Sequence, residues 1–232
     1  MRVRFIVSRY RYGMCSASRI AANTPERGDA SYGMPLVRAT KCVATAISAC
    51  YRIRSMMRIP PIEPPFDSTV AEDLVKLMPP GVPPLRLFRA LAHNPRVLRR
   101  VRKGGLLDPG SIAVRQREIV ILRTTALCRS EYEWGVHVAF FAKAAGFTPA
   151  QIAATVSGDL GAFSPDDALL VELCDALHHG AAVPDALWRR LAAAYRSDQL
   201  VELVALAGQY HMISYVTNAL GIELEPDAPR FG

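Results

Sequence analysis

Residues 114–146 read VRQREIVILRTTALCRSEYEWGVHVAFFAKAAG, and this stretch decides the fold of the chain. Its first part, 114–127, is apolar at nearly every position after Glu118, which predicts a helix buried on most of its sides. A second helix is predicted from about 131 to 145, followed by Gly146, a residue type that commonly ends helices. Neither segment alternates between apolar and polar residues as a half-buried strand would. Two such helices in succession predict the centre of an all-α domain.

The flanking sequence predicts more helices, and no segment shows a convincing strand pattern bounded by turns. Thr148, Pro149 and Gln151 form a capping box with proline at the first helical position, which predicts a helix start there. Proline and Asn-Pro breakers delimit the helices on the N-terminal side. The other predicted helices span residues 70–77, 85–92, 95–106, 165–178, 184–195 and about 197–221.

The charge of the chain is concentrated at one end. The 232 residues are 50% apolar and 21% charged, an ordinary globular composition, and carry a formal net charge of +7. Residues 1–56 hold ten basic and two acidic side chains, so the remaining 18 basic and 19 acidic ones leave 57–232 near neutral. The basic run Arg96–Lys103 is interpreted as the solvated face of a helix. We therefore expect no nucleic-acid partner.

Residues 1–56 form a basic leader, rich in Arg and poor in acids. They lack the apolar core of a secretory signal and the roughly 20 apolar residues of a membrane-spanning helix. The leader is predicted to be disordered or poorly structured, or an artefact of upstream translation, in preference to a targeting or nucleic-acid-binding arm. Residues 57–232 are predicted to be the folded domain, with no membrane partner.

The five cysteines are widely spaced and form no C-x-x-C pair. This pattern does not indicate a disulfide framework, and it favours a reducing, cytoplasmic location. No metal-finger spacing is present, and no metal ligand is predicted. Cys128, at the end of an apolar helix, is by itself typical of an inert buried thiol.

Ionisable residues interrupt the most apolar helices. Glu118 and Arg123 lie in the first of them, and Glu133 and His137 share a face of the second at i, i+4 spacing, next to Trp134. A buried charge is costly unless it is paired. A neighbouring carboxylate raises the pKa of a histidine and burial lowers it, so such clusters are typical of proton-transfer sites. Tyr210 and His211 interrupt the last helix in the same way.

Structural interpretations of these residues stay open. Ser130 and Glu133 have the spacing of a capping box. Glu118 could pair with Arg115 or Arg123 alone, and His211 could be a hydrogen-bonded residue without a catalytic role. Glu118, Glu133, His137 and His211 could together bind a metal ion. The spacing patterns among them involve only two residues at a time, so they are weak evidence for such a site.

Several segments resemble the carboxymuconolactone decarboxylase family, whose relatives include alkylhydroperoxidase-like proteins. The similarity extends over about 57–226 and leaves the leader outside. It implies an alkylhydroperoxidase-like helical domain that forms trimers or hexamers, with the active site near subunit contacts and no cofactor. The similar segments are REIVILR (117–123), EYEWGVH (131–137), AGFT (145–148), PPGVP (79–83), LFRALAHNP (87–95) and QYHMIS (209–214).

The chain departs from the thiol peroxidase branch of this family. That branch has a C-x-x-C pair at the positions that Ser130 and Glu133 occupy here, so no resolving-cysteine cycle is expected and Cys128 is left as a lone thiol. Glu118 and His137 match the proton-transfer positions of the family. The resemblance therefore favours proton-transfer chemistry over thiol chemistry.

The leading hypothesis is a decarboxylase or related lyase or isomerase acting on a small lactone or cyclic acid without a cofactor. An enolate left by loss of carbon dioxide needs a stabilising donor and an acid to reprotonate carbon. The alternatives are an alkylhydroperoxidase-like peroxidase that uses Cys128, and a non-catalytic family member. The predicted roles are His137 as general acid/base, Glu133 as its orienting carboxylate, Glu118 as a second proton acceptor, Arg123 or Arg115 as substrate anchor, and Trp134, Tyr210 and His211 as pocket residues.

Overall fold

A computed structural model of the chain describes residues 57–232, and the regular secondary structure of this part is all helical, as predicted. The predictions made for residues 1–56 lie outside the described residues. Within 57–232 no helix is both long and apolar enough to cross a bilayer. The helices are α2 (Ser68–Val75), α3 (Arg86–Leu91), α4 (Pro95–Lys103), α5 (Val114–Leu127), α6 (Glu131–Phe141), α7 (Pro149–Ser157), the short 3-10 helix η1 (Leu160–Ala162), α8 (Pro165–Gly180), α9 (Asp185–Ala194) and α10 (Ser197–Leu220).

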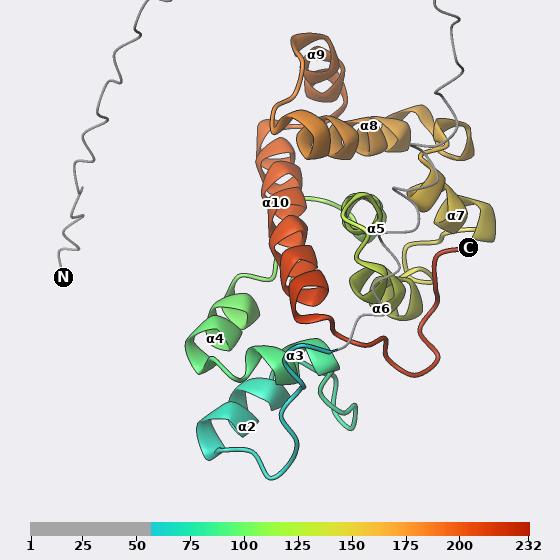
Figure 1. The fold of residues 1–232 in the computed structure, drawn as a ribbon. Coiled ribbons are helices and arrows are strands. Elements are labelled where there is room, and N and C mark those ends of the chain that lie inside the picture. Colours follow the sequence, from blue (N-terminus) through green and yellow to red (C-terminus); the bar gives the residue numbers. More distant parts are fainter. Residues whose placement is uncertain (1–56) are drawn as a thin grey trace, which may run out of the picture. The chain divides into compact units, whose positions relative to one another are not determined.

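Helix α5 is the centre of the domain. It packs against α6, α7, α8 and α10, which surround it in Figure 1. The run Ile119–Leu122 has no solvent exposure, which confirms the predicted burial of this helix. The main apolar cluster gathers around it and includes Leu170, Leu173, Leu203 and Leu206.

A second apolar cluster joins the N-terminal helices α2, α3 and α4 to α6 and α10. Leu74, Leu87 and Leu98 supply the N-terminal part, and Val136 and Ile213 supply the part from α6 and α10. The two clusters meet along α10, where Tyr210 belongs to the first and Ile213 to the second. Three buried ionisable residues, Glu118, Glu133 and His137, lie beside Tyr210 at this junction.

Helix ends follow local chemistry. The capping box at Thr148 is confirmed, since its hydroxyl accepts from the amide of Gln151 while the Gln151 side chain accepts from the Thr148 amide. The predicted helix 95–106 ends at Lys103, because Gly104 closes it. The predicted helix 131–145 ends at Phe141, and the chain then turns to Gly146, whose positive φ of 68° suits glycine.

The C-terminal segment folds back over α3 and α6. The Tyr132 hydroxyl donates to Glu225 Oε1 at 2.6 Å, and the amide of Phe231 donates to Glu131 Oε1 at 2.8 Å. At Gly135 the backbone carbonyl of Pro229 comes so close that a β-carbon would clash with it. These contacts fix the face of α6 against the end of the described chain.

Candidate active site

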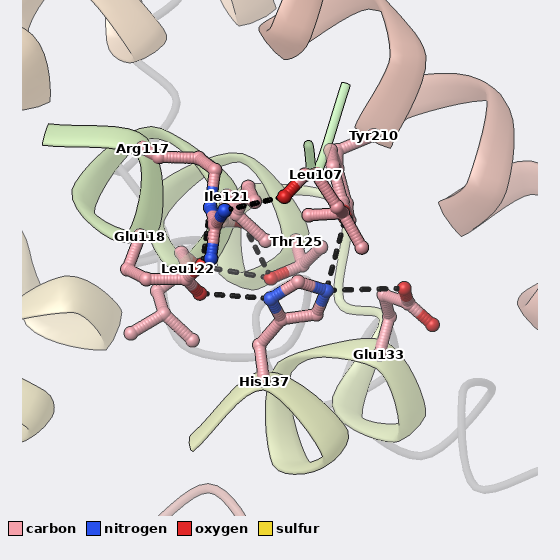
Figure 2. Close-up of polar contacts among 9 residues, drawn as sticks. All are labelled: Leu107, Arg117, Glu118, Ile121, Leu122, Thr125, Glu133, His137 and Tyr210. Atoms are coloured by element: carbon pink, nitrogen blue, oxygen red, sulfur yellow. Dashed lines mark hydrogen bonds and ion pairs between the residues drawn. The ribbon is translucent and has the colours of Figure 1, made fainter. Parts of the chain in front are cut away.

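A buried ion pair joins α5 to α6 at the junction of the two apolar clusters. His137 Nδ1 lies 2.8 Å from Glu118 Oε2, and both residues are buried. Figure 2 shows the imidazole between this carboxylate on one side and Glu133 and Tyr210 on the other. The sequence indicates Glu118 in one helix and the i, i+4 pair of Glu133 and His137 in the next, and packing of α5 on α6 brings them together.

Arg117 is the cation that pairs with Glu118. Its Nε donates to Glu118 Oε1 at 2.8 Å, and its Nη1 donates to the carbonyl of Leu107 at 2.9 Å (Figure 2). The guanidinium also lies 5.1 Å from the ring centroid of Phe141. The alternative that Glu118 pairs with Arg115 or Arg123 is wrong, since these arginines pair with Asp167 and Asp175. The spacing rules for helix faces could not indicate a pair of adjacent residues.

The second ring nitrogen of His137 faces two further side chains. Nε2 lies 3.0 Å from the Tyr210 hydroxyl and 3.5 Å from Glu133 Oε1. The other carboxylate oxygen, Glu133 Oε2, is buried and has no hydrogen-bond partner among the described residues. A buried carboxylate oxygen without a donor is costly, so it indicates a place where a ligand can donate a hydrogen bond.

The alternative that Glu133 serves as the reciprocal partner in a capping box is wrong. The Ser130 hydroxyl is 2.8 Å from the Thr217 hydroxyl and makes no side-chain cap to α6. Glu133 instead turns toward His137. Ser130 is buried against α10, and that contact takes the hydroxyl away from the helix end.

Opposing effects set the protonation of the imidazole. Burial lowers the pKa of His137, but the hydrogen bonds and negative charges of Glu118 and Glu133 outweigh it and raise the pKa to about 9. The imidazole is therefore an imidazolium at neutral pH and donates from both nitrogens. Burial, followed by the two carboxylates, raises the pKa of Tyr210 well above its ordinary value, so its hydroxyl keeps its proton.

A cavity of about 390 Å³ opens beside this cluster. Glu133 and Tyr210 are part of its wall, and His137 lies one hydrogen bond behind them. Apolar side chains from α3, α10 and the segment before α5 form much of the rest of the cavity wall. Three basic residues border the cavity, and Asp108 is its second acidic residue after Glu133. The apolar group includes Leu87, Phe88, Leu106, Leu107 and Ile213, and the basic group is Lys76, Arg102 and Lys103.

The two predicted arginine anchors lie elsewhere. Arg115 Nε donates to Asp167 at 2.8 Å, and Arg123 Nε donates to Asp175 at 2.7 Å. Arg123 also donates to the carbonyls of Thr155 and of the following residue at the end of α7. Neither arginine lines the cavity, and the contacts of both join helices of the domain. Long side chains of this kind reach partners on other helices that no local spacing indicates.

The role of Arg123 in packing can be measured. Replacing Arg123 by methionine should lower the free energy of unfolding by about 2 kcal/mol, because Asp175 and two helix-end carbonyls lose their donor. The matched control is Arg190→Met, whose partner pair with Glu172 is on the surface and should cost no more than about 0.5 kcal/mol. Urea unfolding of both variants measures the two losses in free energy of unfolding. Equal losses would contradict the packing role of Arg123.

Three further predicted residues also lie outside the cavity wall. Trp134 Nε1 donates to the Thr155 hydroxyl at 2.9 Å, and the indole packs on Phe231. His211 and Cys128 lie near His178, in a group apart from His137. Burial raises the pKa of the Cys128 thiol, which disfavours a reactive thiolate at this position.

Sequence reasoning overlooked Arg117 and the basic border of the cavity. Arg117 lies in the segment REIVILR, but nothing in the sequence distinguishes it from Arg123 in the same segment or from Arg115 just before it. Arg102 and Lys103 were assigned to a solvated face, and Arg102 is instead half-buried, with its Nε 3.0 Å from Asp73 Oδ1. Only the fold of α2 and α4 brings this charge to the cavity.

Comparison with solved structures supports the fold. An uncharacterised peroxidase-related protein from Silicibacter sp. TM1040 aligns with a TM-score of 0.64 at 14% identity, over 75% of this chain and 94% of that one. An uncharacterised peroxidase-related protein from Ralstonia eutropha JMP134, described as an alkylhydroperoxidase core, aligns with a TM-score of 0.62 at 15% identity, over 73% and 94%. Identities this low establish the likeness of the fold alone.

Comparison with curated proteins finds no match. The sequence model of the carboxymuconolactone decarboxylase family matches residues 94–161, the part of the chain that contains α5 and α6. This agrees with the resemblance seen in the sequence and with the alkylhydroperoxidase-like helical fold. The matched residues include Glu118, Glu133 and His137.

Proposed function

We propose that the cavity beside Glu133 and Tyr210 is the active site of a lyase or isomerase that acts on a small lactone or cyclic acid by proton transfer. The observation that carries the proposal is the buried chain of contacts from Glu118 through His137 to the two residues in the cavity wall. A structural ion pair alone would not need a hydroxyl and a carboxylate at the edge of a cavity.

The charges and shape of the cavity favour a small anionic substrate. A volume of about 390 Å³ is at the lower end of the range for ligand pockets, and the apolar wall suits a hydrocarbon ring. Lys76 and Lys103 contribute positive charge at the border of the cavity, and this charge would attract a substrate carboxylate. We therefore assign these two lysines, rather than Arg115 or Arg123, to attraction of the substrate.

The mechanism follows from the direction of the hydrogen bonds. With His137 as imidazolium, Nε2–H donates to the Tyr210 oxygen, and the Tyr210 O–H is free to donate into the cavity. When the carboxylate of a substrate leaves as carbon dioxide, the electron pair of the broken C–C bond stays as an enolate. Tyr210 stabilises the enolate oxygen and passes a proton to carbon, and His137 returns a proton to Tyr210. Glu118 holds the ring of His137 in place throughout, and a proton from solvent restores the imidazolium before the next turnover.

The test is turnover of a panel of small cyclic carboxylic acids and their lactones, followed by release of carbon dioxide and by the ultraviolet spectrum of the product. His137→Gln and Tyr210→Phe should lower kcat by about 10²–10⁴-fold on any substrate that the wild type converts. His93→Gln is the matched control, because His93 is exposed and lies away from the cavity; it should leave kcat unchanged.

Two outcomes of this test would replace the proposal. Equal rates for the wild type and both variants would make His137 a structural residue. Binding of the acids without any turnover would favour the third hypothesis, a non-catalytic family member. The peroxidase hypothesis needs peroxide-dependent loss of one thiol that Cys128→Ser abolishes, and the burial of this thiol away from His137 disfavours it.

We further propose a homo-oligomer, a trimer or hexamer, in the cytoplasm. Several large apolar side chains are exposed on the described surface, among them Val75, Val201 and Tyr215. Burial of such side chains between copies would stabilise an assembly. Light scattering of the purified chain measures its mass directly, and a monomer at micromolar concentration would contradict this proposal.

A further inference from the structure

A second cluster of ionisable side chains lies where α5, α8 and α10 meet, apart from the proposed active site. Cys128 is the C-cap of α5, His178 lies in the last turn of α8, and His211 lies in α10. One ligand atom from each residue lies within 4.8 Å of the others. His178 Nδ1 is 3.1 Å from His211 Nε2 and 3.8 Å from Cys128 Sγ.

These separations fit a tetrahedral metal ion. Zn–N bonds of about 2.05 Å and a Zn–S bond of about 2.3 Å place two nitrogens roughly 3.3 Å apart, and sulfur and nitrogen roughly 3.6 Å apart. The observed 3.1 Å and 3.8 Å differ from these values by only a few tenths of an ångström. The ligand atoms of the third pair, Cys128 and His211, lie within 4.8 Å of each other, so side-chain movement of up to about 1.2 Å would bring them to the same geometry.

The surroundings hold one ligand in the right form. His211 Nδ1–H donates to the Ala207 carbonyl at 3.0 Å, one turn earlier in α10, so Nε2 carries the lone pair and faces the cluster. Such a hydrogen bond to the second ring nitrogen is the usual way in which a protein orients a metal-binding histidine. The C-terminal ends of α5 and α8, which carry the negative ends of their helix dipoles, add a favourable field for a cation.

The cluster also has room for another ligand. His178 and His211 border a hollow of about 380 Å³, together with Ala207, Gly208 and Tyr215. A site with three protein ligands and one open position is typical of zinc centres that bind water or a small molecule. Among the described residues no fourth protein side chain joins the three possible ligands, and the hollow leaves space for a further ligand.

We propose that Cys128, His178 and His211 bind one thiophilic divalent transition-metal ion, best matched by Zn²⁺, with a fourth coordination position open to the hollow. Binding replaces the His178–His211 hydrogen bond and releases the thiol proton of Cys128, because a coordinating thiol is deprotonated. The three ligands are far apart in sequence, which is why no spacing motif predicted them. This proposal does not depend on the reaction assigned to His137.

The test uses Co²⁺ and Zn²⁺ on the full chain, in a background with Cys15, Cys42 and Cys50 changed to serine so that these thiols cannot bind metal. Co²⁺ should bind at one ion per chain, with a thiolate-to-cobalt charge-transfer band and the visible bands of four-coordinate cobalt. Zn²⁺ should displace it. Cys128→Ser should remove the charge-transfer band. His211→Ala and His178→Ala should each weaken binding by more than the 10–100-fold that loss of a second-shell partner costs.

His179→Ala is the matched control, because His179 is exposed next to His178 and is not one of the three ligands; it should change neither the band nor the affinity. Helical circular dichroism of each variant establishes that the domain is folded. The absence of a charge-transfer band in the background protein would overturn the proposal. So would a band that survives Cys128→Ser, or equal weakening by His179→Ala and His211→Ala.

Discussion

Replacing Glu118 by alanine should lower the free energy of unfolding by about 3–5 kcal/mol, the cost of leaving a buried charge without its partner. Glu118 has no solvent exposure and is the acceptor for both Arg117 and His137. Its loss leaves the buried guanidinium of Arg117 without its carboxylate and removes the contact that most raises the pKa of His137. Chemical denaturation at pH 7, with the variant and the wild type side by side, measures the difference.

Two further variants separate the charge of Glu118 from its volume. Glu118→Gln keeps an acceptor oxygen and most of the packing, so it should cost less than Glu118→Ala. Glu72→Ala removes an exposed carboxylate whose partner Lys76 is also exposed, and should change stability by no more than about 0.5 kcal/mol. If Glu118→Ala cost no more stability than Glu72→Ala, the cluster of Arg117, Glu118 and His137 would not be a stabilising unit.

The stability of the domain should fall by about 2 kcal/mol between pH 7 and 9, owing to His137 alone. Its pKa is about 9 in the folded chain and about 6.5 in an unfolded one, so the folded state binds the extra proton. Stability of this origin is complete below about pH 6.5 and is lost as the pH rises through about 9. Unfolding by urea at a series of pH values in this window measures the slope.

The control for the pH series is His137→Gln, which should lose the slope due to His137 and keep only a smaller one near pH 9. That remainder comes from the thiols of Cys128 and Cys174, because burial raises their pKa in the folded chain above the value of an unfolded thiol. Two other kinds of group titrate outside the range from pH 7 to pH 9. The pKa of His178 is lowered, by burial first and then by its neighbours His211 and His179, so it acts below pH 7. Burial raises the pKa of Tyr210 and other buried tyrosines, which act above pH 9. Parallel slopes in the variant and the wild type would show that His137 is neutral in the folded chain.

Much of the fold was predictable because the signals are local. The apolar run 119–122 marks a helix whose every side must be covered, and the structure buries it completely. Thr148 and Gln151 cap a helix through neighbours three residues apart, so their roles are visible in the sequence itself. The end of α6 was missed, since the turn after Phe141 continues the apolar sequence and depends on how the chain packs onto Gly146.

The candidate site was predictable only in part. Glu118 and His137 were identified because charges in apolar helices need partners, but the identity of the partners is decided between helices. The Tyr210–His137 contact joins α10 to α6, and the Arg117–Glu118 pair joins two adjacent residues that helix geometry places on different faces. Ser130 shows the opposite case, in which a clear local signal is overridden by a tertiary hydrogen bond to Thr217.

The close approach of Pro229 to Gly135 has a consequence for how α6 can vary in evolution. Gly135 lies two residues before His137, on a part of the helix turned toward the C-terminal segment, where any side chain would meet backbone. Backbone cannot retreat by changing a rotamer, so a substitution would displace either the segment or the helix that carries Glu133 and His137. We therefore expect Gly135 to tolerate few replacements, as the ionisable residues beside it do, although it contributes no side chain to the site.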